Sequence, residues 1–120
     1  MSANDLKSLD DQLNQMILTG KALEAMEKFY DTNVTMQENG DAPCVGLAAN
    51  FEREKQFFGM VETYHGKLVS QAIGDGVTMA EWFSDVALKN GFKYQSGQVS
   101  VRKWKNGKIV SERFYYKPPA

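Results

Sequence analysis

The sequence lacks features that mark several common classes of protein. It has one cysteine, Cys44, so no internal disulfide can form. No apolar run approaches the roughly 20 residues that cross a bilayer, and the polar residues 1–12 lack the apolar segment of a secretory signal. These absences predict a cytoplasmic protein that does not enter a membrane.

Neither sign of charge predominates, and metal-ligating residues are few. The chain has 14 Lys and Arg residues against 15 Asp and Glu residues, for a formal net charge of −1. A nucleic-acid-binding protein concentrates positive potential, so nucleic acid is not expected as a partner. One His and one Cys leave zinc without a ligand set, and Gly74-Asp75-Gly76 lacks the following helix of a phosphate loop. No metal and no cofactor are expected.

The remaining composition is that of an ordinary globular domain. The chain has 120 residues, of which 42% are apolar and 24% charged. A single hydrophobic core suits chains of roughly this length. We therefore expect one domain over residues 1–120.

The first half of the chain has helical periodicity, interrupted once. An apolar stripe predicts a first helix, with Asn4 or Asp5 as its cap. After the break at Thr19-Gly20, apolar spacing predicts a second helix over about residues 22–30, and residues 46–60 form a third. Residues 34–38 alternate as a strand does, and residues 39–43 supply the turn that ends it.

The second half alternates with a period of two, from about residue 62 to residue 117. Three dipeptides that favour tight hairpins interrupt it: Asp75-Gly76, Asn90-Gly91 and Asn106-Gly107. They predict a four-stranded antiparallel meander. Strands longer than about ten residues must twist and bend. The expected fold is therefore an α+β cone, with three helices in the concave face of a strongly curved, mixed but mainly antiparallel sheet of five to six strands.

Hairpin register assigns a lining to this cone. A two-residue turn at Asn106-Gly107 pairs Val99 with Phe114, Val101 with Glu112 and Lys103 with Val110, all on the inward face. The same register, continued through the turns at Asn90-Gly91 and Asp75-Gly76, assigns further residues to the inward face: Ala80, Trp82, Val69, Gln71 and Ile73, with His65 and Lys67 further along the strand. The outward face then carries Ser100, Arg102, Trp104, Ser111, Arg113 and Tyr115. A bulge would exchange the two faces of a strand.

The order of elements resembles a known superfamily. Residues 34–38 (VTMQE), Pro43, Gly46 and residues 104–116 (WKNGKIVSERFYY) are similar to the SnoaL-like branch of the nuclear transport factor 2-like superfamily, which has a cystatin-like cone. Its members include polyketide cyclases, ketosteroid isomerase, dehydratases and non-catalytic binding proteins. The resemblance implies a fold more strongly than an activity.

Ketosteroid isomerase provides a test at the level of residues. The resemblance of this sequence to ketosteroid isomerase puts Glu38 at the position of that enzyme's general base. Its two oxyanion donors correspond approximately to Leu13 and to Val99 or Val101, none of which can donate. A missing donor of this kind commonly costs about 10²–10³ in rate, which argues against that isomerisation by the same groups.

Three residues are candidates for acid–base chemistry. Glu38 and Glu112 are expected to point inward, where burial would raise a carboxyl pKa, although Glu112 could instead pair with Lys103 or with an arginine. His65 is the only histidine and either moves a proton or is structural. The expected ligand-binding set is Met36, Phe57, Met60, Gln71, Trp82, Val99, Val101, Phe114 and Tyr116.

Three functions remain open. The first is an isomerase, cyclase or dehydratase acting on a carbonyl-bearing apolar molecule, with Glu38 as base and Tyr116, Gln71 or His65 positioning the oxygen. The second is a non-catalytic pocket for a similar small molecule, and the third is a protein-interaction domain. A homodimer is expected through the outward face, where Arg102, Trp104, Arg113, Tyr115, Glu81 and Phe83 combine aromatic area with charge.

Overall fold

A computed structural model describes residues 2–118 of the chain. The structure has three helices, α1 (Ala3–Leu18), α2 (Ala22–Phe29) and α3 (Leu47–Met60), and six strands. The first two strands lie between α2 and α3, and the other four follow α3. The strands are β1 (Tyr30–Glu38), β2 (Cys44–Val45), β3 (Val61–Ile73), β4 (Val77–Leu88), β5 (Lys93–Lys105) and β6 (Lys108–Tyr116).

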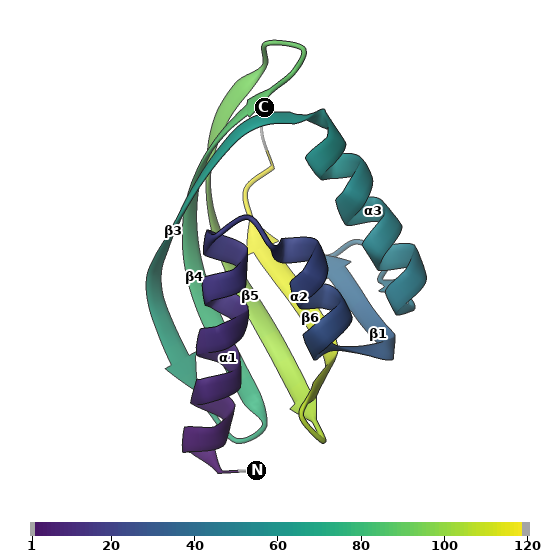
Figure 1. Cartoon of the computed structure of the whole chain (residues 1–120), viewed down its shortest axis with the longest axis vertical. Helices are drawn as coiled ribbons and strands as arrows, with labels where there is room; N and C mark the ends of the chain where they lie inside the picture. The colour runs from purple at the N-terminus through teal and green to yellow at the C-terminus, as the bar shows by residue number, and fades with distance from the viewer. Residues whose placement is uncertain (1, 119–120) are drawn as a thin grey trace.

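All six strands form one curved sheet in the order β2-β1-β6-β5-β4-β3. β1 runs parallel to β6, and the other neighbouring strands are antiparallel. Figure 1 shows the three helices on one side of this sheet, with the long strands β3 and β4 curving around them. The predicted α+β cone is confirmed. Among the described residues, no helix is both long and apolar enough to cross a membrane.

Local signals in the sequence explain several boundaries. Ser2 caps α1 in a reciprocal capping box with Asp5, so the expected cap at Asn4 or Asp5 is wrong by a few residues. Asn106 and Gly107 have φ angles of 53° and 78°, the left-handed conformation that a tight hairpin requires at both positions. The three predicted turns therefore separate β3, β4, β5 and β6 as expected.

A bulge between β5 and β6 overturns the predicted faces of β5. Lys105 pairs with Lys108 and Trp104 with Ile109, but Lys103 then pairs with Ser111, which leaves Val110 unmatched. An extra residue in one strand shifts every later pair by one. Ser100, Arg102 and Trp104 consequently point inward and are buried, whereas Val99, Val101 and Lys103 lie on the outer face.

A second bulge, in β3, changes the predicted lining there. Leu68 pairs with Trp82 and Ser70 with Glu81, so Val69 is unmatched and is 51% exposed. Beyond this bulge His65 and Lys67 are exposed, contrary to the expectation that they face inward. Gln71 and Ile73, on the other side of the bulge, remain on the concave side as predicted.

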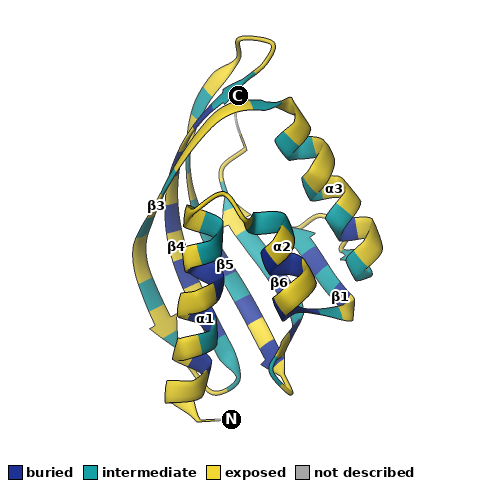
Figure 2. Ribbon diagram, viewed as in Figure 1, coloured by how far each residue is buried: buried dark blue, intermediate teal, exposed yellow. Residues whose placement is uncertain are grey.

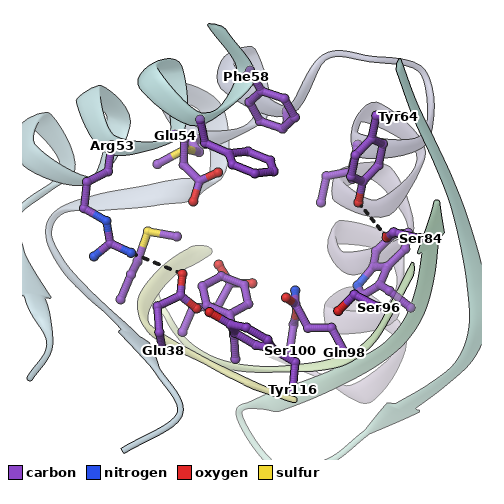
Figure 3. Close-up of a pocket in the computed structure, with 18 of the residues that line it drawn as sticks. Glu38, Arg53, Glu54, Phe58, Tyr64, Ser84, Ser96, Gln98, Ser100 and Tyr116 are labelled. Carbon is purple, nitrogen blue, oxygen red and sulfur yellow. Dashed lines mark hydrogen bonds and ion pairs between the residues drawn. The ribbon is translucent and has the colours of Figure 1, made fainter. Parts of the chain in front are cut away.

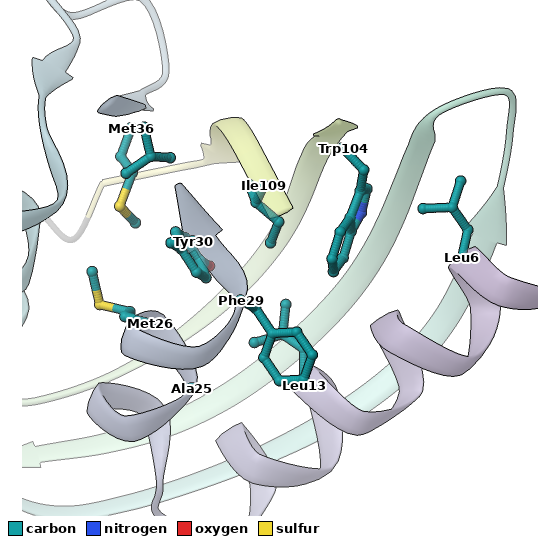
Figure 4. Close-up of a cluster of buried hydrophobic side chains, with 10 residues drawn as sticks. Leu6, Leu13, Ala25, Met26, Phe29, Tyr30, Met36, Trp104 and Ile109 are labelled. Atoms are coloured by element: carbon teal, nitrogen blue, oxygen red, sulfur yellow. The ribbon is translucent and has the colours of Figure 1, made fainter. Parts of the chain in front are cut away.

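The apolar core lies where α1 and α2 meet the sheet. Leu13 and Phe29 pack there with Trp104 and Ile109, and the Phe29 and Trp104 rings meet edge to face with centroids 6.3 Å apart (Figure 4). Figure 2 shows that α3 has mostly exposed and intermediate positions, and Asn50 is its one buried residue. Because α3 buries so little against the sheet, space remains beneath it.

A network of polar groups is buried beneath α1, and we call Asp10, Asn14, Thr78, Arg102 and Glu112 the polar core. Nη1 of Arg102 donates to Asp10 at 2.8 Å and to Asn14 at 2.6 Å, and its Nε donates to Glu112 at 2.9 Å. The Thr78 hydroxyl donates to Asp10 at 2.7 Å. Buried charges persist when they are paired in this way.

Candidate active site

A cavity of about 440 Å³ lies between α3 and the concave face of the sheet. Side chains of all three helices and of β1, β3, β4, β5 and β6 line it, and Figure 3 shows part of this lining. The lining combines a majority of apolar and aromatic side chains with a substantial minority of polar and charged ones, and polar groups that converge on an apolar cavity are typical of a small-molecule site.

Glu54 presents a carboxyl to this cavity from α3 (Figure 3). It makes no hydrogen bond or ion pair with any of residues 2–118. Burial raises the pKa of Glu54 to about 7, with smaller contributions from the negative charges of Glu112 and Glu38, while Arg53 opposes the rise. Both protonation states of Glu54 are therefore populated at neutral pH, as a general acid–base group requires.

Glu38 lies at the end of β1, near Arg53 and Tyr116. Its carboxylate accepts a hydrogen bond from Nη2 of Arg53 at 3.2 Å in a partly exposed ion pair. Burial raises the pKa of Glu38, the direction expected from the sequence, and Arg53 counteracts this. Burial likewise raises the pKa of the Tyr116 phenol, so Tyr116 keeps its proton and can donate a hydrogen bond.

Glu112 is on the cavity floor with both oxygens engaged. The Tyr30 hydroxyl donates to one oxygen, and Nε of Arg102 donates to the other. Burial, followed by the charge of Glu112, raises the pKa of Tyr30, so this hydroxyl also stays protonated. The arginine partner that the sequence left open for Glu112 is Arg102, so each carboxylate oxygen of Glu112 already accepts a hydrogen bond from the protein.

The other predicted site residues divide into two groups. Met36, Phe57, Trp82, Phe114 and Tyr116 line the cavity. Met60, Gln71, Val99, Val101 and His65 do not.

Each residue outside the cavity has a physical reason for its position. Met60 is at the end of α3 and is 55% exposed. Gln71 donates instead to Asp10 and Asp11 of α1. The bulge at Val110 turns Val99 and Val101 outward. His65 is exposed in a shallow surface depression on β3, β4 and β5.

Polar side chains form one wall of the cavity opposite α3. Ser96, Gln98 and Ser100 alternate along β5, so all three face inward. On β3 and β4 the hydroxyls of Tyr64 and Ser84 share a hydrogen bond of 3.0 Å (Figure 3). This wall can form hydrogen bonds with a ligand whose other side contacts Phe57 and Phe58.

Sequence analysis missed Glu54, Tyr30 and Arg102 as site residues. A signal for Glu54 was present, since it follows the buried Asn50 by four residues and precedes Phe57 by three, the spacing of one helix face. The position of Arg102 depended on a bulge that the sequence does not mark. No cluster of three potential metal ligands occurs among the described residues.

Solved structures with the same fold have low sequence identity to this chain. A protein from Mesorhizobium loti assigned as a SnoaL-like polyketide cyclase has a TM-score of 0.81 and 20% identity, covering 97% of this chain and 100% of its own. A protein with a ketosteroid isomerase-like fold from Catenulispora acidiphila, in complex with trimethylamine, has a TM-score of 0.72 and 14% identity, covering 85% and 80%. An LEH-like epoxide hydrolase from M. tuberculosis has a TM-score of 0.73 and 14% identity, covering 92% and 80%.

A search of curated proteins finds no match. The family model of the SnoaL-like domain, in contrast, matches residues 5–116, which is nearly the whole chain. The protein therefore belongs to the family of SnoaL-like domains.

Proposed function

We propose that the protein binds a small, largely apolar, carbonyl-bearing molecule in the cavity and transfers a proton at the carbon next to the carbonyl, with Glu54 as the acid–base group. The observation that carries this proposal is the Glu54 carboxyl, which faces the cavity without a partner among the described residues and has a pKa of about 7. A general base works best when its pKa lies near the working pH.

The proposed chemistry is simple to balance. The Glu54 carboxylate removes a proton from the carbon beside the carbonyl, the electron pair of that C–H bond forms a carbon–carbon double bond, and the π pair of the carbonyl moves to its oxygen. The protonated Glu54 then exchanges its proton with solvent and returns a solvent proton to the same carbon, which gives exchange, or it returns a proton to another carbon of a conjugated ketone, which gives isomerisation. Phe57 and Phe58 line the same cavity and offer an apolar surface to the rest of the ligand.

Glu54 is a better candidate for the base than Glu38, which the sequence favoured. The Glu38 carboxylate already pairs with Arg53, and its side chain is 28% exposed. We propose that Glu38 and Tyr116 instead contact the ligand near the mouth of the cavity. The names of the similar structures include a cyclase and an epoxide hydrolase, so the choice of reaction here rests on the residues of this chain.

Deuterium exchange tests this proposal. 2-Acetylnaphthalene, a flat ketone with exchangeable methyl protons, is incubated with the protein in D₂O, and NMR follows loss of the methyl signal. We expect catalysed exchange that Glu54→Gln slows by about 10²- to 10⁴-fold. Glu52→Gln is the matched control, because Glu52 is exposed and lies two residues earlier on the same helix.

Two results would contradict the proposed reaction. One is binding of the ketone without exchange by the wild-type protein, which would make the cavity a non-catalytic binding site. The other is exchange by Glu54→Gln at the rate of the wild type, which would exclude Glu54 as the base.

We also propose a homodimer through the outer face of the sheet, with a corrected composition. Arg102 and Trp104 are buried inside the cone and cannot contribute. Val69, Met79, Phe83 and Tyr115 are each at least 40% exposed on strands β3, β4 and β6 and would form the apolar part of the interface. Sedimentation should give a dimer at micromolar concentration that Phe83→Glu dissociates. A monomeric wild-type protein would refute the interface.

A further inference from the structure

Arg102 has one side of its guanidinium unused by the protein. Its Nε binds Glu112, and its Nη1 binds Asp10 and Asn14. Nη2 has no hydrogen-bond partner among residues 2–118. Two N–H donors of a charged group therefore remain available.

These two donors face the cavity. Every enclosed polar side-chain atom in the described part of the chain has a hydrogen-bond partner, so Nη2 is not an enclosed atom. The Arg102 side chain is only 1% exposed and belongs to the cavity lining. The small accessible part of the guanidinium thus lies on the cavity floor, where it can meet a ligand but little bulk water.

The charge of Arg102 is fixed by its neighbours. Burial alone would lower its pKa, but the carboxylates of Glu112 and Asp10 hold the guanidinium in its charged form. These two carboxylates face a single guanidinium in the polar core. A ligand carboxylate would add a third negative charge beside them, whereas a neutral oxygen would accept the hydrogen bond without adding charge.

We infer that Nη2 of Arg102 holds the carbonyl oxygen of the ligand and thereby selects carbonyl compounds over hydrocarbons of the same shape. This inference rests on the proposed function. It also adds the electrophilic group that the proposed reaction needs, because a charged donor stabilises the negative charge that develops on oxygen as the proton leaves.

The arrangement of elements fits this role. Glu54 enters the cavity from α3, and Ser100 lies on the opposite wall, on β5 (Figure 3). Arg102 follows Ser100 by two residues and therefore shares its face of the strand. A carbonyl oxygen on Arg102 would leave the rest of the ligand between the sheet and α3, toward Glu54.

A matched pair of probes tests the inference. 2-Acetylnaphthalene and 2-ethylnaphthalene have nearly the same shape and differ in the carbonyl oxygen. We expect the wild-type protein to bind the ketone at least about tenfold more tightly in NMR titrations, since a hydrogen bond to a charged group is worth this much or more. Arg102→Met should reduce that ratio to near one without weakening binding of the hydrocarbon.

Other donors on the same strand provide the control. Ser100→Ala should lower the ratio by less than about threefold, because a neutral hydroxyl contributes less than a charged donor. If Ser100→Ala rather than Arg102→Met abolishes the preference, Arg102 is not the anchor. Equal binding of the two probes by the wild-type protein would overturn the inference as well.

A readout in the wild-type protein covers the case in which Arg102→Met does not fold. The side-chain N–H resonances of Arg102 should shift when the ketone binds and should not respond to the hydrocarbon. Ketone binding without such a shift refutes the anchor. Stronger binding of 2-naphthoate through the same resonances would show that the site takes a carboxylate instead.

The failure of this inference is distinguishable from failure of the proposed reaction. Glu54→Gln should abolish deuterium exchange but leave the ratio of ketone to hydrocarbon affinity unchanged. A wild-type protein that binds the two probes equally but catalyses exchange refutes the role of Arg102 alone. A wild-type protein that prefers the ketone but does not catalyse exchange refutes the reaction alone.

Discussion

The polar core beneath α1 and the cavity beneath α3 contain the same kinds of charged residue in opposite circumstances. In the polar core, Arg102 is paired with Asp10 and Glu112, and Asn14 and Thr78 complete the hydrogen bonds. In the cavity, Glu54 has no partner among the described residues. Pairing makes a buried charge structural, and the lack of pairing shifts its pKa toward neutrality. Arg102 belongs to both regions.

The largest expected effect comes from breaking a pair in the polar core. Asp10→Ala leaves Arg102 buried with one carboxylate and removes the acceptor of the Thr78 hydroxyl. We expect a loss of about 3–5 kcal/mol in the free energy of unfolding, measured by urea denaturation. Asp11→Ala, at a more exposed neighbouring carboxylate, should cost less than about 1 kcal/mol. Equal losses in the two variants would mean that the polar core is not specially stabilising.

Substitution of Glu54, in contrast, is expected to stabilise the protein. Its pKa rises from 4.5 to about 7 on folding, so the folded protein binds the proton more tightly than the unfolded chain. Stability is therefore lost as the pH rises from about 4.5 through 7. At pH 8, Glu54→Gln should have a free energy of unfolding up to about 3 kcal/mol higher than that of the wild type, measured by urea denaturation. This difference should vanish below pH 4.5.

The matched variant Glu52→Gln removes an exposed carboxyl from the same helix and controls for the loss of one negative charge from α3. If Glu54→Gln is equally stable relative to the wild type at pH 4.5 and pH 8, the Glu54 carboxyl titrates normally and the contrast between the two regions disappears.

A smaller effect is expected at Arg53, whose charge lowers the pKa of both Glu38 and Glu54. Arg53→Met should raise the pKa values of both Glu38 and Glu54, and only slightly, because the Arg53 side chain is 42% exposed and screened by water. NMR titration of labelled carboxyl groups measures both values. A fall in either value would contradict the assigned electrostatics.

Local chemistry made much of the fold predictable. Asn106-Gly107 adopts the left-handed conformation at both residues, as its identity favours, and the helical spacing in the first half produces three helices. Met36 and Trp82 lie on β1 and β4, which do not contain the bulge at Val110, and they reach the cavity as predicted.

The site was less predictable, for a physical reason. Neither Val69 nor Val110 has a side chain that marks a bulge, so the faces of β5 and part of β3 could not be assigned from alternation. The sequence predicts a surface position for Arg102, because arginine is rarely buried without partners. One of those partners, Asp10, is 92 residues earlier in the chain, where no local pattern connects the two.

The span of the polar core has a consequence for the order of folding. Asp10 belongs to the first helix, Arg102 to β5 and Glu112 to β6, the last strand of the sheet. During synthesis, Asp10 leaves the ribosome long before Arg102, so the ion pair between them cannot form until β5 has emerged. Contacts between such distant segments close late and slow the search for the native topology. The polar core can therefore be complete only after the last two strands, β5 and β6, have been synthesised.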